Sequence, residues 1–309
     1  MLSFVTTVAS SGIRLAIPFL LTALGETVTE KSGVRNLGLE GIILASAFSS
    51  FWVAYNTQSA GLGLAAGLLV GGFIGVFLAI VMVRLGANQL ITGVMVTILC
   101  TGLSSFLYSK LFGSAIISPL SGFKPIHIPV FSDVPFLGKV LFSHNPLVYA
   151  AIALVPLFSF FLSRTNTGLR IRACGENPQT AESVGINVYR VRYFSLVFGS
   201  MMAGFAGSYL VLADAKWFSH GMSAGRGWIA LAIVIFGRWN SPLVLLGSLL
   251  YGVIYALQVG LQTLHIRVVP YQFLLMFPYL MILVTLLISR RETGKPAALG
   301  RPFRRSRYF

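Results

Sequence analysis

Long runs without a charged residue dominate the pattern of this chain, and short polar segments separate them. Gly41 to Val83 contains no Asp, Glu, Lys or Arg, and neither does Trp239 to Ile266. A helix needs about 20 mostly apolar residues to cross the hydrocarbon core of a bilayer. The first run is long enough for two crossings, with a polar break at Asn56 to Ser59. The pattern therefore predicts an all-α polytopic membrane protein.

We expect about nine crossings, within a range of roughly eight to ten, because each needs a run of this length. The run from 227 to 237 is too short to cross alone, so it either includes its polar lead-in or forms half of a broken helix. No basic segment precedes the first crossing and no clear small-residue cleavage site follows it, so it is not interpreted as a cleavable signal peptide. The expected crossings are 4–24, 37–55, 61–83, 88–109, 146–163, 193–213, 225–237, 241–262 and 268–289.

Composition agrees with this interpretation. Hydrophobic residues make up 56% of the 309-residue chain, charged residues 10%, and the mean hydropathy is +0.82. A soluble domain carries roughly 25% charged residues. Two cysteines, Cys100 and Cys174, exclude a disulfide framework and a cysteine-built metal site. The four histidines have no metal-ligand spacing, and no nucleophile–base pairing is evident, so an enzyme is not expected.

The net charge of +15 would suit nucleic-acid binding, but its distribution follows membrane topology instead. Basic residues concentrate in the cytoplasmic loops of membrane proteins. With the C-terminus inside, 16 of the 23 Lys and Arg residues fall in inside segments, 6 fall outside, and Arg14 lies within a crossing. The bias predicts a cytoplasmic C-terminus, with membrane lipid rather than nucleic acid as the partner of the excess charge.

Two polar stretches suggest an internal repeat. Glu26 ends the first crossing and residues 36–41 open the second, whereas Asp214 ends the sixth and residues 223–228 open the seventh. The two stretches are expected on opposite sides of the membrane. Crossings 1–4 and 6–9 would then form an inverted repeat with discontinuous helices, joined by the fifth crossing, as in many transporters. The alternative is that two Gly-rich loops are alike by chance.

The segment from 168 to 188 carries the clearest local signals. Asn177 can cap a helix N-terminus, and Pro178 suits the first helical position. Gly185 can take the left-handed position after the helix, with Ile186 making the closing contact. These signals predict one short helix over 178–184, held off the membrane. Such a helix suits docking to a cytoplasmic partner; an ordinary amphipathic loop helix is the alternative.

Three stretches resemble the permease subunits of ATP-binding-cassette (ABC) importers, in the branch that also serves branched-chain amino acids and ribose. They are residues 168–187, 30–41 and 225–240, which include Gly-Leu-Arg, Gly-Glu-Asn-Pro and Gly-Ile-Asn in the first stretch. The likeness runs from about residue 17 to residue 287 and is strongest to nucleoside-type permeases. Similar permeases serve riboflavin uptake in some bacteria.

The resemblance implies partners for this chain: cytoplasmic ATPase subunits, a second and different permease subunit, and an extracytoplasmic solute-binding lipoprotein. It also implies a multi-pass protein of the cytoplasmic (inner) membrane. Residues 1–290 would form the permease domain, with a coupling loop at 164–192, and 291–309 a basic cytoplasmic tail. No Walker A phosphate loop occurs here, so no cofactor is expected in this chain and ATP–Mg would bind the partner ATPase.

The expected function is therefore translocation of a nucleoside-like solute, either a nucleoside or riboflavin, driven by ATP hydrolysis on another subunit. A simple sugar or a branched-chain amino acid is the alternative substrate. The alternative function is a stand-alone secondary transporter or channel with inverted repeats. It would need an ion-coupling site, which the few intramembrane acids do not obviously supply.

Candidate site residues fall into two groups. The ATPase-coupling group is Glu176, Asn177, Pro178, Ala181, Gly185 and Ile186. The candidate solute path is Asn36, Glu40, Asn88, Gln89, Thr92, Ser223 and Trp228, each with a packing role as its alternative. For Glu40 the alternative is pairing with Arg35, Arg84 or a free backbone amide of the broken helix.

Glycines repeat every four residues at Gly63, Gly67, Gly71 and Gly75. Such a stripe lets another helix approach closely, so it predicts a packing face. The long segment 110–145 either contacts the solute-binding protein or only covers the pore.

Overall fold

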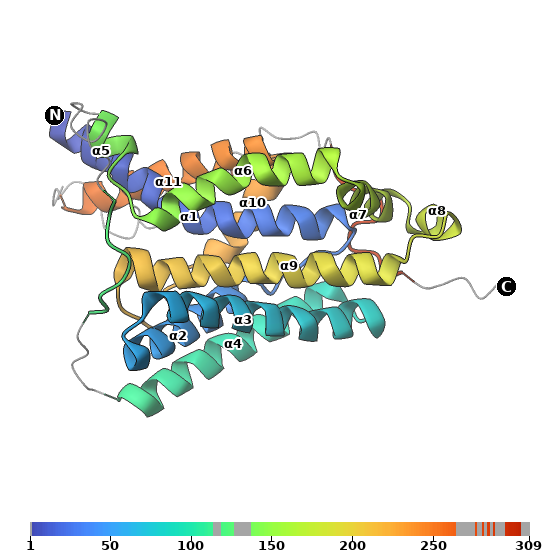
Figure 1. Ribbon diagram of the computed structural model, residues 1–309, viewed down its shortest axis with the longest axis horizontal. Helices are drawn as coiled ribbons and strands as arrows, with labels where there is room; N and C mark the ends of the chain where they lie inside the picture. Colours follow the sequence, from blue (N-terminus) through green and yellow to red (C-terminus); the bar gives the residue numbers. More distant parts are fainter. Residues whose placement is uncertain are drawn as a thin grey trace.

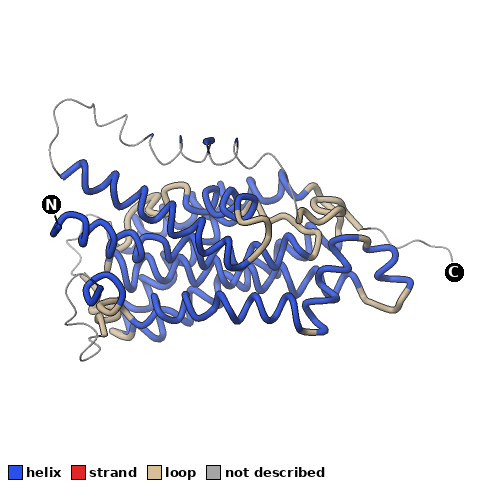
Figure 2. The backbone as a smooth tube through the Cα atoms, turned by 90° about the horizontal axis from the view of Figure 1, so that it is seen from above, coloured by secondary structure: helices blue, strands red, loops and turns tan. Residues whose placement is uncertain are grey.

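The computed structural model describes residues 2–113, 119–126, 137–263 and 294–303, with isolated positions between 276 and 287. Helices make up almost all of this described backbone, and no strand is present in it (Figure 2). The long helices lie side by side along one axis, with α9 between α1 and α3 (Figure 1). The long helices are α1 (Leu2–Lys31), α2 (Leu39–Thr57), α3 (Ala60–Ala79), α4 (Gln89–Phe112), α6 (Pro146–Arg164), α9 (Val188–Tyr209) and α11 (Ser241–Thr263).

Shorter elements stand at the ends of the bundle or extend the long helices. The π-helical turns η1 (Ile80–Arg84) and η2 (Leu210–Ala215) continue α3 and α9. The short helices are α5 (Leu137–Leu141), α7 (Asn166–Glu176), α8 (Pro178–Ser183) and α10 (Arg226–Phe236). α5 lies at one end of the bundle, and α7 and α8 lie at the other (Figure 1).

Six described helices are long and apolar enough to cross a membrane. They correspond to six of the nine expected crossings. The expected crossing 37–55 forms α2, and 225–237 forms α10, which is 11 residues long. At 1.5 Å per residue α10 covers only about 16 Å, too little to span a bilayer alone. The expected crossing 268–289 lies outside the continuously described residues.

Two predicted boundaries were wrong. α1 continues to Lys31, beyond the expected end at residue 24, and α9 begins at Val188, before the expected start at 193. The polar residues at the end of α1 are buried inside the protein: Glu26 has no exposed surface and Thr29 donates to the carbonyl of Ser195 at 3.1 Å. Tertiary contacts therefore keep a polar stretch helical where hydropathy alone indicated a loop.

The glycine stripe is a packing face, as predicted. All four glycines are buried on α3. A Cβ atom at Gly71 would lie 2.6 Å from the carbonyl oxygen of Ser200 on α9, and one at Gly63 would lie 2.8 Å from Ala54 on α2. Both neighbouring helices approach so closely that no larger side chain fits. α11 packs on α1 with comparable closeness, since a Cβ at Gly252 would lie 2.6 Å from Ala16.

Candidate functional site

The predicted short helix is present as α8. Asn177 Oδ1 accepts a hydrogen bond from the amide of Thr180 at 3.1 Å, and Pro178 occupies the first turn. Gly185 has a φ of +84°, and the amide of Ile186 donates to the carbonyl of Ala181 at 3.0 Å. These contacts confirm the local prediction for 178–184. A second helix, α7, precedes α8; the sequence analysis did not predict it.

One side of α8 is anchored and the other faces outward. Pro178 and Ala181 are buried, whereas Val184 at the tip is 70% exposed. α8 extends from the end of the bundle beyond α7 and α9 (Figure 1). An exposed apolar side chain on a small, well-capped helix is a surface that a partner can contact.

Residues 294–303, here called the C-terminal strap, hold this unit to the bundle. Backbone hydrogen bonds run from Ala298 N to Gly175 O at 2.8 Å and from Gly300 N to Gly33 O at 3.1 Å. Arg192 Nη1 donates to the carbonyl of Arg301 at 3.0 Å. The strap thereby joins α7, the end of α1 and the start of α9. The sequence analysis had treated this region only as a basic tail.

The strap ends in a small apolar cluster. Phe303 is 6% exposed and packs with Cys174, Ala181 and Val188. Burial raises the pKa of the Cys174 thiol to about 11, an effect larger than the opposing influence of Arg192. The thiol is therefore protonated at neutral pH, as expected for a packing residue rather than a reactive one.

Glu40 caps the short helix α10. Its two carboxylate oxygens accept hydrogen bonds from the backbone amides of Gly225 at 2.8 Å and Gly227 at 2.7 Å, at the start of α10. The residue at the N-cap position of α10 supplies no side-chain hydrogen bond of its own. A carboxylate there satisfies free amides and complements the positive end of the helix dipole. This is the backbone-amide pairing given as the alternative for Glu40.

Glu26 and Glu30 organise the connection between α1 and α2. Glu26 Oε1 accepts from the amide of Asn36 at 2.9 Å, and its Oε2 atom is buried without a partner. Glu30 accepts from Arg35 Nε at 2.9 Å and from Trp239 Nε1 at 2.6 Å. Buried carboxylates from the end of α1 thus fix both the turn into α2 and the junction after α10.

The other candidate path residues lie in separate places. Asn36 is buried, accepts from Gly38 N at 2.9 Å and donates to Ser200 Oγ at 3.3 Å. Ser223 is buried near the start of α10, where Trp228 is 42% exposed.

Asn88 and Gln89 stand at the start of α4 and line a cavity of about 430 Å³ with Arg35 and the C-terminal strap. Asn88 accepts from the amides of Leu90 and Ile91, and Gln89 Oε1 accepts from the amide of Arg35 at 2.8 Å. Thr92 donates to the carbonyl of Asn88 at 2.8 Å. The two parts of the candidate path are therefore the start of α4 and the start of α10.

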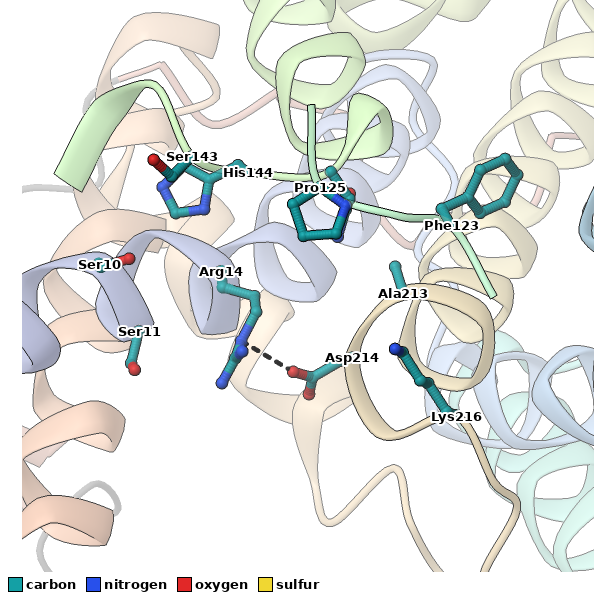
Figure 3. Close-up of a pocket in the computed structure, with 11 residues that line it drawn as sticks. Ser10, Ser11, Arg14, Phe123, Pro125, Ser143, His144, Ala213, Asp214 and Lys216 are labelled. Carbon is teal, nitrogen blue, oxygen red and sulfur yellow. Dashed lines mark ion pairs between the residues drawn. The ribbon is translucent and has the colours of Figure 1, made fainter. Parts of the chain in front are cut away.

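A polar cavity of about 310 Å³ lies at the α5 end of the bundle. Arg14 of α1 and Asp214 of η2 face each other across it and form an ion pair of 3.1 Å (Figure 3). Lys216 and His144 also line it, and burial lowers the pKa of the His144 imidazole, which keeps the ring neutral at pH 7. Asp214 thus pairs with a cation at the end of η2. Among the described residues no group of His, Cys, Asp or Glu is placed to hold a metal ion.

A bundle of apolar helices, six of them long enough to cross a bilayer, is the architecture of a multi-pass membrane protein. Residues 8–286 match the family described as the branched-chain amino acid transport system / permease component. The chain belongs to this family, so it is a non-catalytic permease component of an ABC transporter.

Three curated proteins are similar over most of the chain. TsgC13 of Haloferax volcanii, which is named as a glucose ABC transporter permease protein, is 36% identical over 274 residues, covering 87% of this chain and 82% of its own length. The nucleoside ABC transporter permease protein NupC of Lactococcus lactis is 33% identical, covering 92% of each chain. The guanosine ABC transporter permease protein NupQ of Bacillus subtilis is 33% identical, covering 93% of each.

Proposed function

We propose that this chain is one of two permease subunits of an importer that moves a nucleoside across the cytoplasmic membrane, and that α7 and α8 receive the motion of a separate ATPase. The observation that carries the proposal is the α7–α8 unit. It is capped at both ends, anchored on its inner side through Ala181 and Pro178, and free on its outer side at Val184. A rigid element of this kind passes movement of a docked partner to the helices behind it.

The same geometry supports the proposed orientation. α7, α8 and the C-terminal strap lie together at one end of the bundle (Figure 1). That end also carries the basic segments that favour the cytoplasmic side. The opposite end, with α5 and the described residues 119–126, would then face the solute-binding lipoprotein.

An inverted repeat is part of the proposal. In it α1, α2 and α3 correspond to α9, α10 and α11. Support comes from reciprocal packing: α3 lies on α9 through Gly71, and α11 lies on α1 through Gly252. In each unit, a carboxylate from another helix also accepts a backbone hydrogen bond just before or at the start of the second helix. Glu26 does so at the turn into α2, and Glu40 does so at α10. Opposed half-helices at the centre are where transporters of this architecture place the solute path.

A second permease subunit is proposed to cover the open side of α4. Leu90, Met95 and Ile98 are each at least 60% exposed. Only 22% of the most apolar stretch of α4 is buried within the described chain. The solute path would run between the two subunits, close to Trp228 and the start of α4. The resemblance stated above favours a different partner permease over a second copy.

Nucleoside is the proposed solute class because two of the similar proteins are named for nucleoside or guanosine transport. The chemistry of the candidate path agrees, since it offers amides, hydroxyls and an indole, while Glu40 is engaged by backbone amides. A neutral, flat solute with several hydrogen-bonding groups suits such a lining. Glucose and riboflavin are the competing solutes.

The test is reconstitution of this chain with its ATPase, second permease and lipoprotein in liposomes. We expect ATP-dependent uptake of guanosine and weaker uptake of glucose or riboflavin. Gly185→Ala should lower both uptake and solute-stimulated ATP hydrolysis, because Gly185 has a φ of +84° at the end of α8. Gly221→Ala is the matched control, since Gly221 has a φ of +65° and, like Gly185, open space around it.

Two results would overturn the proposal. One is uptake by the isolated chain under an ion gradient without an ATPase. The other is equal loss of activity in Gly185→Ala and Gly221→Ala, because the defect would then reflect backbone strain in general. Preferential uptake of glucose would overturn the assignment of a nucleoside as the solute and leave the rest of the proposal standing.

A further inference from the structure

A third cavity, of about 270 Å³, opens at the α7–α8 end of the bundle. It lies where the end of α1, the end of α6, the middle of α7 and the turn between α10 and α11 meet. Three cationic side chains and three hydroxyls line it, and none of its nine lining residues is acidic. They are Lys31, Arg172 and Arg238, with Ser159, Ser163 and Ser241.

Two polar groups at this cavity are buried without a hydrogen-bond partner. Ser241 is 3% exposed, and its Oγ atom has no partner among the described residues; the Nε atom of Arg172 is likewise buried and unpaired there. Buried polar groups in native proteins are nearly always satisfied, so an unsatisfied pair lining one cavity indicates a missing ligand. Both groups can donate a hydrogen bond, so the ligand must supply acceptors.

The backbone also contributes positive charge to this cavity. Ser241 is the first residue of α11, a helix of 23 residues, so the positive end of its dipole faces the cavity. Free amides at a helix start, joined by cationic side chains, are the usual components of a phosphate-binding site.

Nearby carboxylates do not neutralise the cavity. Glu30 is occupied by Arg35 and Trp239. Glu176 of α7 accepts from the amide of Ala297 at 3.4 Å, and Lys31 donates to the carbonyl of Gly294 at 3.4 Å. The ion pairs that the structure describes are Arg14–Asp214 and Arg35–Glu30. Neither pair includes a cationic residue of this cavity.

We propose that this cavity binds a phosphate group, carried either by the headgroup of an anionic phospholipid or by a soluble phosphate compound. The cavity stands at the ends of the spanning helices α1, α6 and α11, where a headgroup phosphate would lie. The proposal goes beyond solute transport and does not depend on which solute is carried. A bound phosphate would bridge Arg172 of α7 to Ser241 of α11.

The experiment uses the full chain in nanodiscs. One arm compares phosphatidylglycerol retained after delipidation from mixed phosphatidylcholine–phosphatidylglycerol discs, measured by native mass spectrometry. The other arm measures binding of radiolabelled inorganic phosphate in pure phosphatidylcholine discs. Arg172→Gln and Ser241→Ala are the test variants. Arg170→Gln is the matched control, because Arg170 is exposed on the same helix and does not line the cavity.

We expect Arg172→Gln to weaken binding about tenfold or more and Ser241→Ala to weaken it less, since a charge-assisted hydrogen bond is stronger than a neutral one. Arg170→Gln should bind like the native chain. Retention of phosphatidylglycerol without binding of inorganic phosphate identifies the lipid as the source, and the reverse identifies a soluble phosphate compound.

Ser241→Ala keeps the proposal falsifiable if Arg172→Gln misfolds, because the Ser241 hydroxyl makes no hydrogen bond within the described chain. The proposal is overturned if neither probe binds. It is equally overturned if both test variants bind like the native chain, or if Arg170→Gln loses as much binding as Arg172→Gln.

Discussion

Replacing Glu40 by glutamine tests whether this residue holds the broken helix or contacts the solute. The carboxylate accepts from Gly225 N and Gly227 N at 2.8 and 2.7 Å. Glutamine retains one acceptor oxygen but turns an NH₂ donor toward the other amide. The variant therefore keeps the shape of the side chain and loses both its charge and one of its two hydrogen bonds.

The expected loss of stability follows from the lost charge and the lost hydrogen bond. Removing a charge from the N-terminus of a helix costs roughly 0.3–1 kcal/mol, and leaving a buried amide unsatisfied costs about 1–3 kcal/mol. Glu40 is half-buried, so we expect a total in the lower half of the combined range, about 2 kcal/mol. A chain of this size then loses roughly 5 °C in melting temperature.

Thermal unfolding of the purified chain, followed by tryptophan fluorescence, measures the stability. Uptake in liposomes separates KM from the maximal rate. If Glu40 caps α10, the melting temperature falls and the maximal rate falls with it, while KM stays near the native value. Arg170→Gln, which removes a charge from the exposed side of α7, should leave the melting temperature unchanged. An E40Q variant with native stability and an altered KM would refute the capping role and favour solute contact.

Three further predictions concern packing and the C-terminal strap. Gly71→Val should destabilise the bundle by about 1–3 kcal/mol, because the added atoms meet the Ser200 carbonyl; thermal unfolding checks this, and a native melting temperature would contradict it. Phe303→Ala should release the C-terminal strap and raise the protease sensitivity of α8, because Phe303 is 6% exposed in its cluster. Limited proteolysis measures this sensitivity, and an unchanged cleavage pattern would show that the strap does not hold α8 in place. Maleimide should modify Cys174 slowly at pH 7.5 and faster as the pH rises toward 11, because only the thiolate reacts and burial raises the pKa. Site-resolved mass spectrometry follows the reaction, and rapid modification at pH 7.5 would show that the thiol is not buried.

Local chemistry decided how much of this structure could be predicted. α8 was predicted nearly residue by residue because its signals, Asn177, Pro178 and Gly185, act within a single turn. The glycine stripe of α3 was predicted because its four-residue spacing places the glycines on one face of the helix, whichever helix packs against that face. These features need no knowledge of distant residues.

The features that were missed, or that were predicted only as one alternative as for Glu40, all depend on distant partners. Glu40 lies 185 residues from Gly225, so no local pattern identifies its hydrogen bond. The last turns of α1 are polar in sequence and buried only because α9 and Trp239 pack against them. The C-terminal strap has neither helical period nor apolar run, and its order comes from carbonyl and amide groups that α7 and the end of α1 present to it.

The contacts of the α7–α8 unit bear directly on how a push at α8 would spread. Gly168 holds α7 against the end of α6, where a Cβ would lie 2.7 Å from the carbonyl oxygen of Leu162, and a Cβ at Gly175 would lie 2.9 Å from the backbone of Lys31. Contacts this close leave no room for α7 to slide, so under the proposed coupling a displacement of α8 would move the ends of α1 and α6 with it.

The end of α1 is in turn tied to the broken helix. Glu30 accepts from the Trp239 indole at 2.6 Å, just after α10, and Glu40 binds the amides at the start of the same helix. α10 is therefore held at both ends by carboxylates from the α1–α2 region. Under the proposed coupling, a displacement that enters at α8 would reach α10 through these buried, hydrogen-bonded contacts and move this short helix together with the end of α1.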